Sequence, residues 1–432
     1  MQLAFSYTDL AVPTPKIQKS KYQLFLGIGC LYFFFNSFLL PDGLLYTILL
    51  SPFFLVWLGT HKVPVLKYSL LFLLCWLPLL VIHYSLGISL SDYLKSSALY
   101  FTVFLFALTI HTYFRYYSFT YELLMEKVLK LNFLFVIAAV FLLVADKKDI
   151  LWSVTDISEG VSDFPRLRML TYEPSYYSLL LIPSLLYYFQ YIFYRNINRR
   201  QWVLLFTVLI SLGLSLSYGA IFISVLTLGF FILFNFFTGL RRKQNSRFIV
   251  IMGLALVTAV VLILVLFSNS GFVLRILNIF DGNDSSINNR SSQAYFLALS
   301  IADLKSQLFG VGPGQLKLLG QDLISMVYAF STDEATGQTG TARIPSSMAE
   351  TLAIFGYLGF FLKIGVELFL FRKTRVRRSS FRLCLFIFMF IYQFVGSFST
   401  NIVEIFFWVL AFSNVFPDSW FKKPDPVPLP EE

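Results

Sequence analysis

Two arginines and one glutamate stand immediately before an apolar segment, in the stretch FPRLRMLTYEPSYYS at 164–178. Arginine binds phosphate through a planar, always-charged fork, and a carboxylate can act as a general base. Pro174 fits the first turn of a helix, where its missing N–H costs nothing. The helix would then point its N–H groups toward Arg166 and Arg168, which predicts a seat for phosphate beside Glu173. A simple helix cap with arginines at lipid headgroups is the alternative.

A second stretch, RIPSSMAETLAIFGYLGF at 343–360, also opens an apolar segment with a basic residue. Ser347 and Glu350 have the spacing of a capping box, which accounts for both residues structurally and leaves Arg343 unexplained. This helix would again point its N-terminus outward. Arg290 precedes apolar residues at helical spacing, and we expect it to start a helix.

Arg168, Arg290 and Arg343 come from three separate segments, and we expect them to converge on one anionic group, because a clamp of bidentate arginines suits a pyrophosphate. Glu173 is the leading candidate for a general base, since it stands beside the arginines. These four residues form the predicted catalytic set. Other carboxylates that could serve as the base are Glu350, Asp333 and Glu334. The predicted substrate-binding residues are Arg166, Tyr172, Glu350, Gly312 and Gly314.

Three glycines stand at alternate positions in SQLFGVGPGQ at 306–315. The string lacks the preceding strand and the spacing of a dinucleotide-binding fingerprint, and Pro313 would obstruct that turn. A nucleotide site is therefore rejected. A tight backbone turn that redirects the chain is the simpler account of the glycines.

No metal or other cofactor is expected. The histidines lie near the ends of apolar segments and share no ligand spacing, so each is predicted to be interfacial. They are His61, His83 and His111. The cysteines lie inside apolar segments without CxxC spacing, which favours a packing role over a disulfide or zinc site.

The composition is that of a membrane protein. Of 432 residues, 57% are hydrophobic and only 13% are charged, against roughly one quarter charged in a soluble chain. The net charge of +10 is carried by short basic clusters between apolar runs, which is how membrane topology is encoded, so nucleic-acid binding is not expected. We interpret residues 1–432 as a single membrane domain whose first helix is retained rather than cleaved.

A bilayer core of about 30 Å needs about 20 helical residues, so the sequence predicts an all-α bundle of about twelve transmembrane helices. Polar centres at 215–219 and 396–401 divide two long apolar segments into hairpins. The basic loops then lie mostly on one side, which places both termini in the cytoplasm. Two long external loops, 146–173 and 269–347, form the predicted site, and the second contains a helix on the membrane surface. The predicted spans are 22–40, 43–60, 66–87, 93–112, 127–145, 174–194, 202–216, 218–239, 247–268, 348–371, 381–397 and 400–417.

The order of these motifs resembles the superfamily of O-antigen polymerases (Wzy) and O-antigen ligases. The resemblance covers about 160–365: Arg-x-Arg…Glu-Pro-Ser at the mouth of a span, Asn-Arg opening a loop helix, Phe-Gly-Val-Gly-Pro-Gly, and Ser-Ser…Glu-Thr-Leu…Phe-Gly-Tyr-Leu-Gly-Phe. The pair Ser346 and Ser347 stands where the ligases usually have His-Asn, which favours the polymerases. The turn at 217–219 reads Ser-Tyr-Gly where the superfamily often has Ser-Arg-Gly, so one expected arginine is missing.

The resemblance implies a metal-independent, membrane-embedded glycosyltransferase that polymerises oligosaccharide repeat units into a surface polysaccharide at the external face of a bacterial cytoplasmic (inner) membrane. Donor and acceptor would both be glycans linked to undecaprenyl pyrophosphate, with membrane lipid and a chain-length regulator protein as further partners. O-antigen ligation to a lipid acceptor is one alternative. A secondary transporter or flippase of an anionic substrate is another, and its candidate buried residues are Lys363, Glu367 and Glu404.

The distribution of basic residues makes the topology testable. Reporter fusions at Asn245 and Arg377 are expected to report the cytoplasm, and fusions at Asp156 and Thr336 the external side, because basic loops stay on the cytoplasmic side. Paired reporters that are active on opposite sides of the membrane measure this. A cytoplasmic signal at Thr336 would contradict both the twelve-helix topology and the predicted site.

Overall fold

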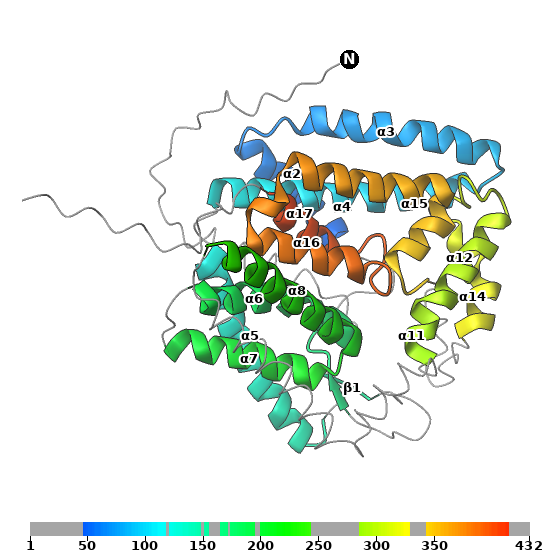
Figure 1. Ribbon diagram of the computed structural model, residues 1–432. Coiled ribbons are helices and arrows are strands. Elements are labelled where there is room, and N and C mark those ends of the chain that lie inside the picture. Colours follow the sequence, from blue (N-terminus) through cyan, green and yellow to red (C-terminus); the bar gives the residue numbers. More distant parts are fainter. Residues whose placement is uncertain are drawn as a thin grey trace, which may run out of the picture.

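Apolar runs of this chain fold into helices, because a backbone in lipid must satisfy its hydrogen bonds within its own segment. The computed structural model describes residues 46–117, 121–147, 151–154, 165–171, 173–194, 199–242, 285–328 and 343–413. These residues are predominantly helical (Figure 1), which confirms the all-α class. The helices are α2 (Tyr46–Thr60), α3 (Val65–Ser85), α4 (Leu90–Tyr117), α5 (Tyr121–Val144), α6 (Pro174–Tyr194), α7 (Arg199–Ser215), α8 (Tyr218–Arg242), α11 (Ser285–Arg290), α12 (Ser292–Asp303), α13 (Leu316–Leu319), α14 (Gln321–Tyr328), α15 (Ser347–Lys373), the short 3-10 helix η4 (Val376–Arg378), α16 (Ser380–Tyr392) and α17 (Ile402–Phe412).

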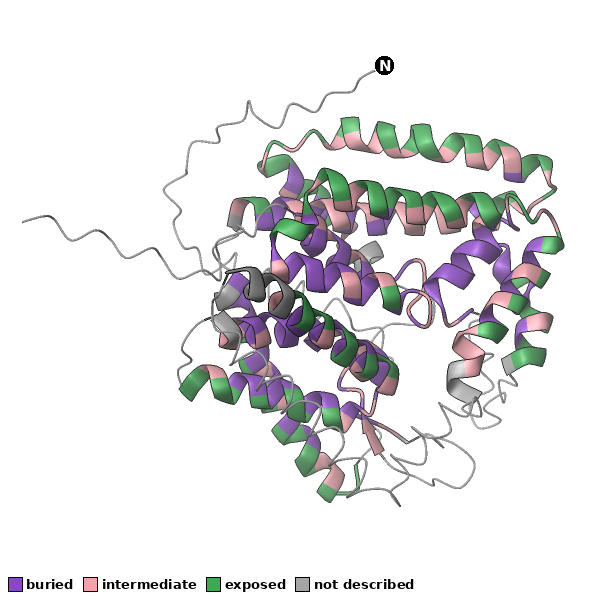
Figure 2. Ribbon diagram, in the orientation of Figure 1, coloured by how far each residue is buried: buried purple, intermediate pink, exposed green. Residues whose placement is uncertain are grey.

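Five helices in the described part of the chain are long and apolar enough to cross a membrane. Large apolar side chains on their outer faces are exposed, for example Leu66 and Leu74 of α3 and Phe361 of α15. Figure 2 shows exposed residues along α3, α15 and α8. A water-soluble protein rarely exposes apolar surface on this scale, so these helices indicate a membrane protein. The five segments are Val65–Ser85, Leu90–Tyr116, Leu124–Val144, Tyr218–Asn235 and Ser347–Lys373.

The predicted spans in the described part of the chain all coincide with helices, and the segments 202–239 and 381–417 are each divided in two, as expected. The spans 22–40 and 247–268 lie outside the described residues. α16 ends at Tyr392 and is followed directly by a turn, so it is shorter than the predicted span 381–397. The number of spans and the side that each loop faces stay predictions.

α16 and α17 form the centre of the bundle and carry most of its buried residues (Figures 1 and 2). They run antiparallel, since Nε of Arg382 in the first turn of α16 donates to the carbonyl of Ala411 near the end of α17, at 2.8 Å. α8 packs on α16, and α4 packs on α17. The turn between the two central helices, residues 393–401, therefore lies at the end of the bundle opposite Arg382.

α15 is broken at Gly356, whose backbone angles (φ 64°, ψ −165°) are essentially restricted to glycine. The arm 347–355 folds back toward the arm 357–373. Nζ of Lys363 lies 2.8 Å from Oγ of Ser347 although sixteen positions separate the two residues. A straight helix would hold them roughly 24 Å apart. The span predicted at 348–371 is therefore two helical arms joined by a sharp bend.

The glycine-rich stretch 306–315, which we call the glycine clasp, closes around this bend. Backbone groups exposed by a broken helix are costly in lipid unless they find partners. Four hydrogen bonds of 2.9–3.0 Å supply those partners: Val311 N–H to Ala353 O, Gly312 N–H to Ile354 O, Tyr357 N–H to Gln307 O and Leu358 N–H to Leu308 O. The expected tight turn is confirmed, and its function is to hold the bend of α15.

The clasp also joins α15 to the turn between α3 and α4. The side-chain amide of Gln315 accepts from Ser89 N–H and donates to Ser89 O, both at 3.0 Å. His83, at the end of α3, lies 2.8 Å from the carbonyl of Phe309 through Nε2. It is fully buried, and its predicted position near the membrane interface stays a prediction. At Gly314 (φ 78°) a Cβ would stand 2.2 Å from the carbonyl oxygen of Asp92, which leaves room for glycine only.

The helix expected in the second long loop is present as α12, which packs on the first arm of α15. Leu297 and Ile301 are buried there, against residues of that arm. Leu304 and Leu308 continue the helical spacing of these residues in the sequence, but they lie beyond the end of α12 and are exposed. Arg290 does not start α12. It ends the preceding short helix α11, and α12 begins at Ser292.

The bend of α15 predicts a sharp difference between two of its glycines. Gly356→Ala is expected to destabilise the protein by more than the roughly 1–3 kcal/mol of a glycine-only conformation, because its Cβ would also stand 2.4 Å from backbone atoms of Leu308. Gly365→Ala, on the same helix, has nothing within 4 Å and is expected to be neutral or slightly stabilising. Thermal unfolding in detergent micelles measures both variants, and equal melting temperatures would contradict the clasp.

Candidate functional site

The turn 393–401 is the floor of the candidate site. Oε2 of Glu350, on the first arm of α15, accepts the backbone N–H of Ser399 at 2.6 Å. The hydroxyl of Ser399 lies 2.9 Å from that of Tyr100 on α4. Glu350 is only 6% exposed, so these contacts hold it in one place. They join α4, α15 and the turn at a single point.

Tyr176, in the first turn of α6, contacts the turn 393–401. Its ring makes an edge contact with Phe398 at 5.4 Å between centroids. The guanidinium of Arg343 lies over the same Phe398 ring, 4.3 Å from its centroid. The charges of Glu173, Arg343 and Glu350 all act on the Tyr176 hydroxyl. Arg343 and Glu350 both contact the turn 393–401, through Phe398 and Ser399 respectively, and Tyr176 contacts the same Phe398.

Tyr392, the last residue of α16, is a second point of convergence. Its hydroxyl interacts electrostatically with Arg290, Glu173 and Glu404. Glu173 thus acts on both Tyr392 and Tyr176, which connects the two groups into one site. The charges that act on the two tyrosine hydroxyls come from two arginines and three carboxylates, which suits an anionic substrate that also gives up a proton.

The two carboxylates have different environments. Glu173 precedes α6 and is partly exposed, and its Oε2 accepts from the hydroxyl of Ser175 at 2.8 Å. Glu350 is buried and already accepts the Ser399 N–H. A general base must reach the substrate, so Glu173 is better placed for that role, as expected from sequence. α6 begins at Pro174, which confirms the predicted helix start.

The N-terminus of α15 is not a seat for phosphate, contrary to expectation. The helix is capped by Ser346, whose Oγ accepts from Ala349 N–H, and the predicted capping box is wrong. Ser347 N–H donates to Gly396 O and Met348 N–H to Gln393 O, so the first three N–H groups are bonded to protein atoms. The bend at Gly356 causes this, because it turns the helix end into the bundle.

Arg166 and Arg168 lie on or beside a β-hairpin formed by β1 (Trp152–Val154) and β2 (Pro165–Leu167). The guanidinium of Arg166 donates to the carbonyls of Ser215 and Leu216, each at 3.3 Å, at the end of α7. It therefore brings a positive charge to the turn between α7 and α8, where the sequence itself reads Ser-Tyr-Gly. Arg168 follows β2, and its backbone bonds to Leu151 and Thr171. It is not among the charges that act on Tyr176 or Tyr392.

The other predicted site residues fall elsewhere. Gly312 and Gly314 lie in the glycine clasp, against His83 and the backbone of Asp92 respectively. Tyr172, Asp333 and Glu334 lie outside the described residues. Among the described residues no group of three or more His, Cys, Asp or Glu side chains could hold a metal ion.

A group of three buried polar side chains and one half-buried lysine lies next to the turn 393–401, and we call it the buried cluster. It consists of Lys363 and Glu367 of α15, Gln393 at the end of α16, and Glu404 of α17. Nζ of Lys363 lies 2.8 Å from Oε1 of Glu404, and Nε2 of Gln393 donates to Oε2 of Glu367 at 2.8 Å. Lys363, Glu367 and Glu404 are the residues that the sequence identified as candidates for a buried transporter site; Gln393 was not among them.

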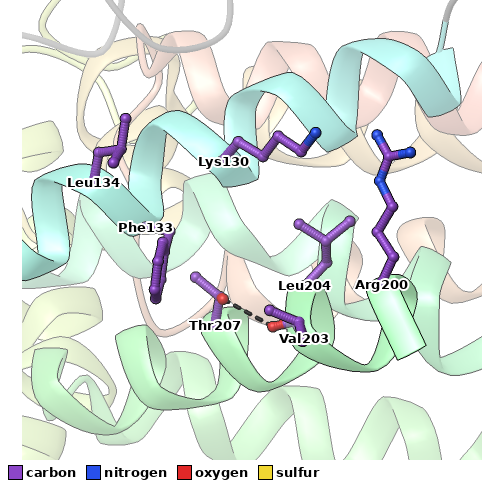
Figure 3. A pocket seen from close by; sticks show the side chains of 7 residues that line it. All are labelled: Lys130, Phe133, Leu134, Arg200, Val203, Leu204 and Thr207. Atoms are coloured by element: carbon purple, nitrogen blue, oxygen red, sulfur yellow. Dashed lines mark hydrogen bonds between the residues drawn. The ribbon is translucent and has the colours of Figure 1, made fainter.

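An apolar groove between α5 and α7 lies apart from the candidate site. Figure 3 shows Phe133 of α5 pointing toward Thr207 of α7. Leu134 of α5 and Val203 and Leu204 of α7 also line the groove. Its two cations, Lys130 and Arg200, both pair with Glu126. The lining offers a sugar almost no hydrogen-bonding groups, so we do not assign this groove to a glycan.

Sequence reasoning missed Tyr176, Tyr392 and Phe398. Tyr176 had one available signal, since it lies two residues after Pro174 in the first turn of a helix that follows Glu173. Tyr392 gave no such signal, because aromatic residues are abundant in every apolar segment of this chain. Its role depends on where α16 ends, and helix ends are set by packing as much as by local sequence.

Comparison with protein-family models gave no match, and comparison with curated proteins gave none either. The resemblance to the O-antigen polymerase superfamily therefore stays a prediction from the motifs.

The ion pair of the buried cluster can be tested by removing one partner and then neutralising the other. Lys363→Met is expected to cost about 3–5 kcal/mol of stability, because it leaves Glu404 charged and buried without its partner. Adding Glu404→Gln should restore most of that loss, since a neutral pair needs no compensation. The control is Lys130→Met, which removes an exposed partner of Glu126 and should cost at most about 1 kcal/mol. Unfolding in detergent measures all three, and additive losses at Lys363 and Glu404 would contradict the pairing.

Proposed function

We propose that this protein is a metal-independent glycosyltransferase that polymerises undecaprenyl pyrophosphate-linked repeat units at the external face of the bacterial inner membrane. The observation that supports this most is the convergence of Glu173, Arg290, Arg343 and Glu350 around two tyrosines at one end of a helical bundle. The substrate's reacting end is a lipid pyrophosphate, which needs cations and access from the membrane. The motif order that resembles the polymerases supports the same reaction.

The chemistry needs little beyond these residues. The acceptor hydroxyl attacks the anomeric carbon of the donor sugar, and the bond from that carbon to the pyrophosphate oxygen breaks. Arg290 and Arg343 stabilise the negative charge that builds up on the departing pyrophosphate. Glu173 takes the proton from the acceptor hydroxyl. The products are a lipid-linked glycan one unit or chain longer and free undecaprenyl pyrophosphate.

A secondary transporter or flippase of an anionic substrate is the second candidate. The buried cluster and the break in α15 favour it, since transporters often use broken helices and keep ionisable residues within the membrane. The arginines and Glu173 favour the polymerase, because they gather at one end of the bundle rather than within it.

Glycan profiling of a strain that lacks the gene separates the candidate functions. Loss of a polymerase leaves surface glycans with a single repeat unit. Loss of a ligase makes lipid-linked polymer accumulate, and loss of a transporter strands substrate in the cytoplasm. Normal polymer length on the surface of the deletion strain would contradict the proposal.

The arginine clamp predicts a strict requirement for guanidinium groups. Arg→Lys at 290 and 343 should each slow polymerisation by roughly thirty- to a thousand-fold, the equivalent of about 2–4 kcal/mol, because lysine does not copy the planar fork. Polymer length at matched membrane abundance is the readout. Arg200→Lys, on an exposed arginine of α7, is the matched control and should be unaffected. Wild-type polymer length in both the Arg290 and the Arg343 variant would rule out the clamp.

A further inference from the structure

The buried cluster has more hydrogen-bond acceptors than its hydrogen-bond donors can satisfy. Glu404 pairs with Lys363, and the N–H of Trp408 also approaches the same oxygen, Oε1, at 3.4 Å. Three buried oxygens have no hydrogen-bond donor among the described residues: Oε2 of Glu404, Oε1 of Glu367 and Oε1 of Gln393. A buried acceptor without a donor destabilises the folded state, and more so when it is charged. The cluster therefore needs at least one more hydrogen-bond donor.

The charges of the cluster point to the same deficit. Lys363 and Glu404 neutralise each other at 2.8 Å, which leaves Glu367 with a neutral partner, the amide of Gln393. The charged groups that act on Glu367 are Lys363, one helical turn away, and Glu404. With both carboxyls ionised, the cluster holds one uncompensated negative charge. Such a charge in a protein interior costs several kcal/mol even after relaxation.

One proton resolves both problems. A carboxylate only accepts hydrogen bonds, whereas a carboxyl group carries a donor of its own. The amide of Gln393 lies beside Glu367, and its own oxygen still needs a donor. A metal cation is a poorer solution, because the ammonium of Lys363 already occupies the same cluster and would repel it. Glu367 is 5% exposed, so bulk water does not reach it freely.

We propose that the buried cluster is a proton-binding site and that Glu367 carries the proton. Protonation makes the cluster neutral and supplies the missing donor. The site lies beneath Tyr392, the neighbour of Gln393 in sequence, whose hydroxyl interacts with both Glu404 and the candidate site. Proton binding here does not depend on the proposed glycosyltransferase activity.

Infrared spectroscopy of the full-length protein in lipid nanodiscs tests the proposal directly. A protonated carboxyl group absorbs at a frequency that a carboxylate lacks, and exposed carboxyls are ionised at neutral pH. The difference spectrum of wild type and Glu367→Gln should contain one protonated-carboxyl band, which the variant has lost. Asp303→Asn, at an exposed carboxylate of α12, is the control and should give no such band. A wild-type spectrum without the band at neutral pH overturns the proposal, whatever the variants do.

Thermal unfolding against pH gives a second readout. The folded wild type holds a proton that the unfolded chain releases, so its melting temperature should fall as pH rises and the proton is lost. Glu367→Gln copies the protonated form and should lose this dependence, as should Glu367→Met if the amide variant fails to accumulate. Asp303→Asn should follow the wild type. A wild-type slope retained in both Glu367 variants would assign the proton elsewhere and overturn the proposal.

Discussion

The arrangement of the site depends on one backbone feature, the sharp bend of α15 at Gly356. Helices in lipid normally run straight, because every residue taken out of the helix leaves backbone groups that need new partners. The glycine clasp at 306–315 supplies those partners with its own N–H and carbonyl groups. The bend then brings Ser347 against Lys363 and seats the first arm on the turn 393–401. The buried cluster and the floor of the candidate site both follow from that placement.

Much of the fold was predictable, because transmembrane helices can be recognised in a sequence by their length and apolar composition. α6 begins at the proline that fits a first helical turn, and the hairpin of α16 and α17 follows from a polar centre in a long apolar segment. The bend in α15 was not predictable. Gly356 is one of several glycines in the segment, and its conformation is imposed by the clasp, which lies far from it in sequence.

The candidate site was predictable in its charged residues and not in its geometry. Charges are rare in such a chain, so Glu173, Arg290 and Arg343 stand out by residue type alone. Spacing gave no information on the roles of Arg166 and Glu350, since their partners are a helix end and a turn from other segments. The local motifs predicted a capping box and an outward-pointing N-terminus for α15. In the structure Ser346 caps this helix, and its first N–H groups bond to the turn 393–401.

The short first arm of α15 also determines when the site can assemble during protein synthesis. The first arm of α15 is about 14 Å long at 1.5 Å per residue, which is too short to cross a bilayer by itself. Only the second arm has the length of a membrane anchor. The first arm can dock on the turn 393–401 only after synthesis has passed Tyr392, because its N-terminus bonds to the carbonyls of Gln393 and Gly396. The site is therefore completed late in biogenesis, when almost the whole chain has left the ribosome.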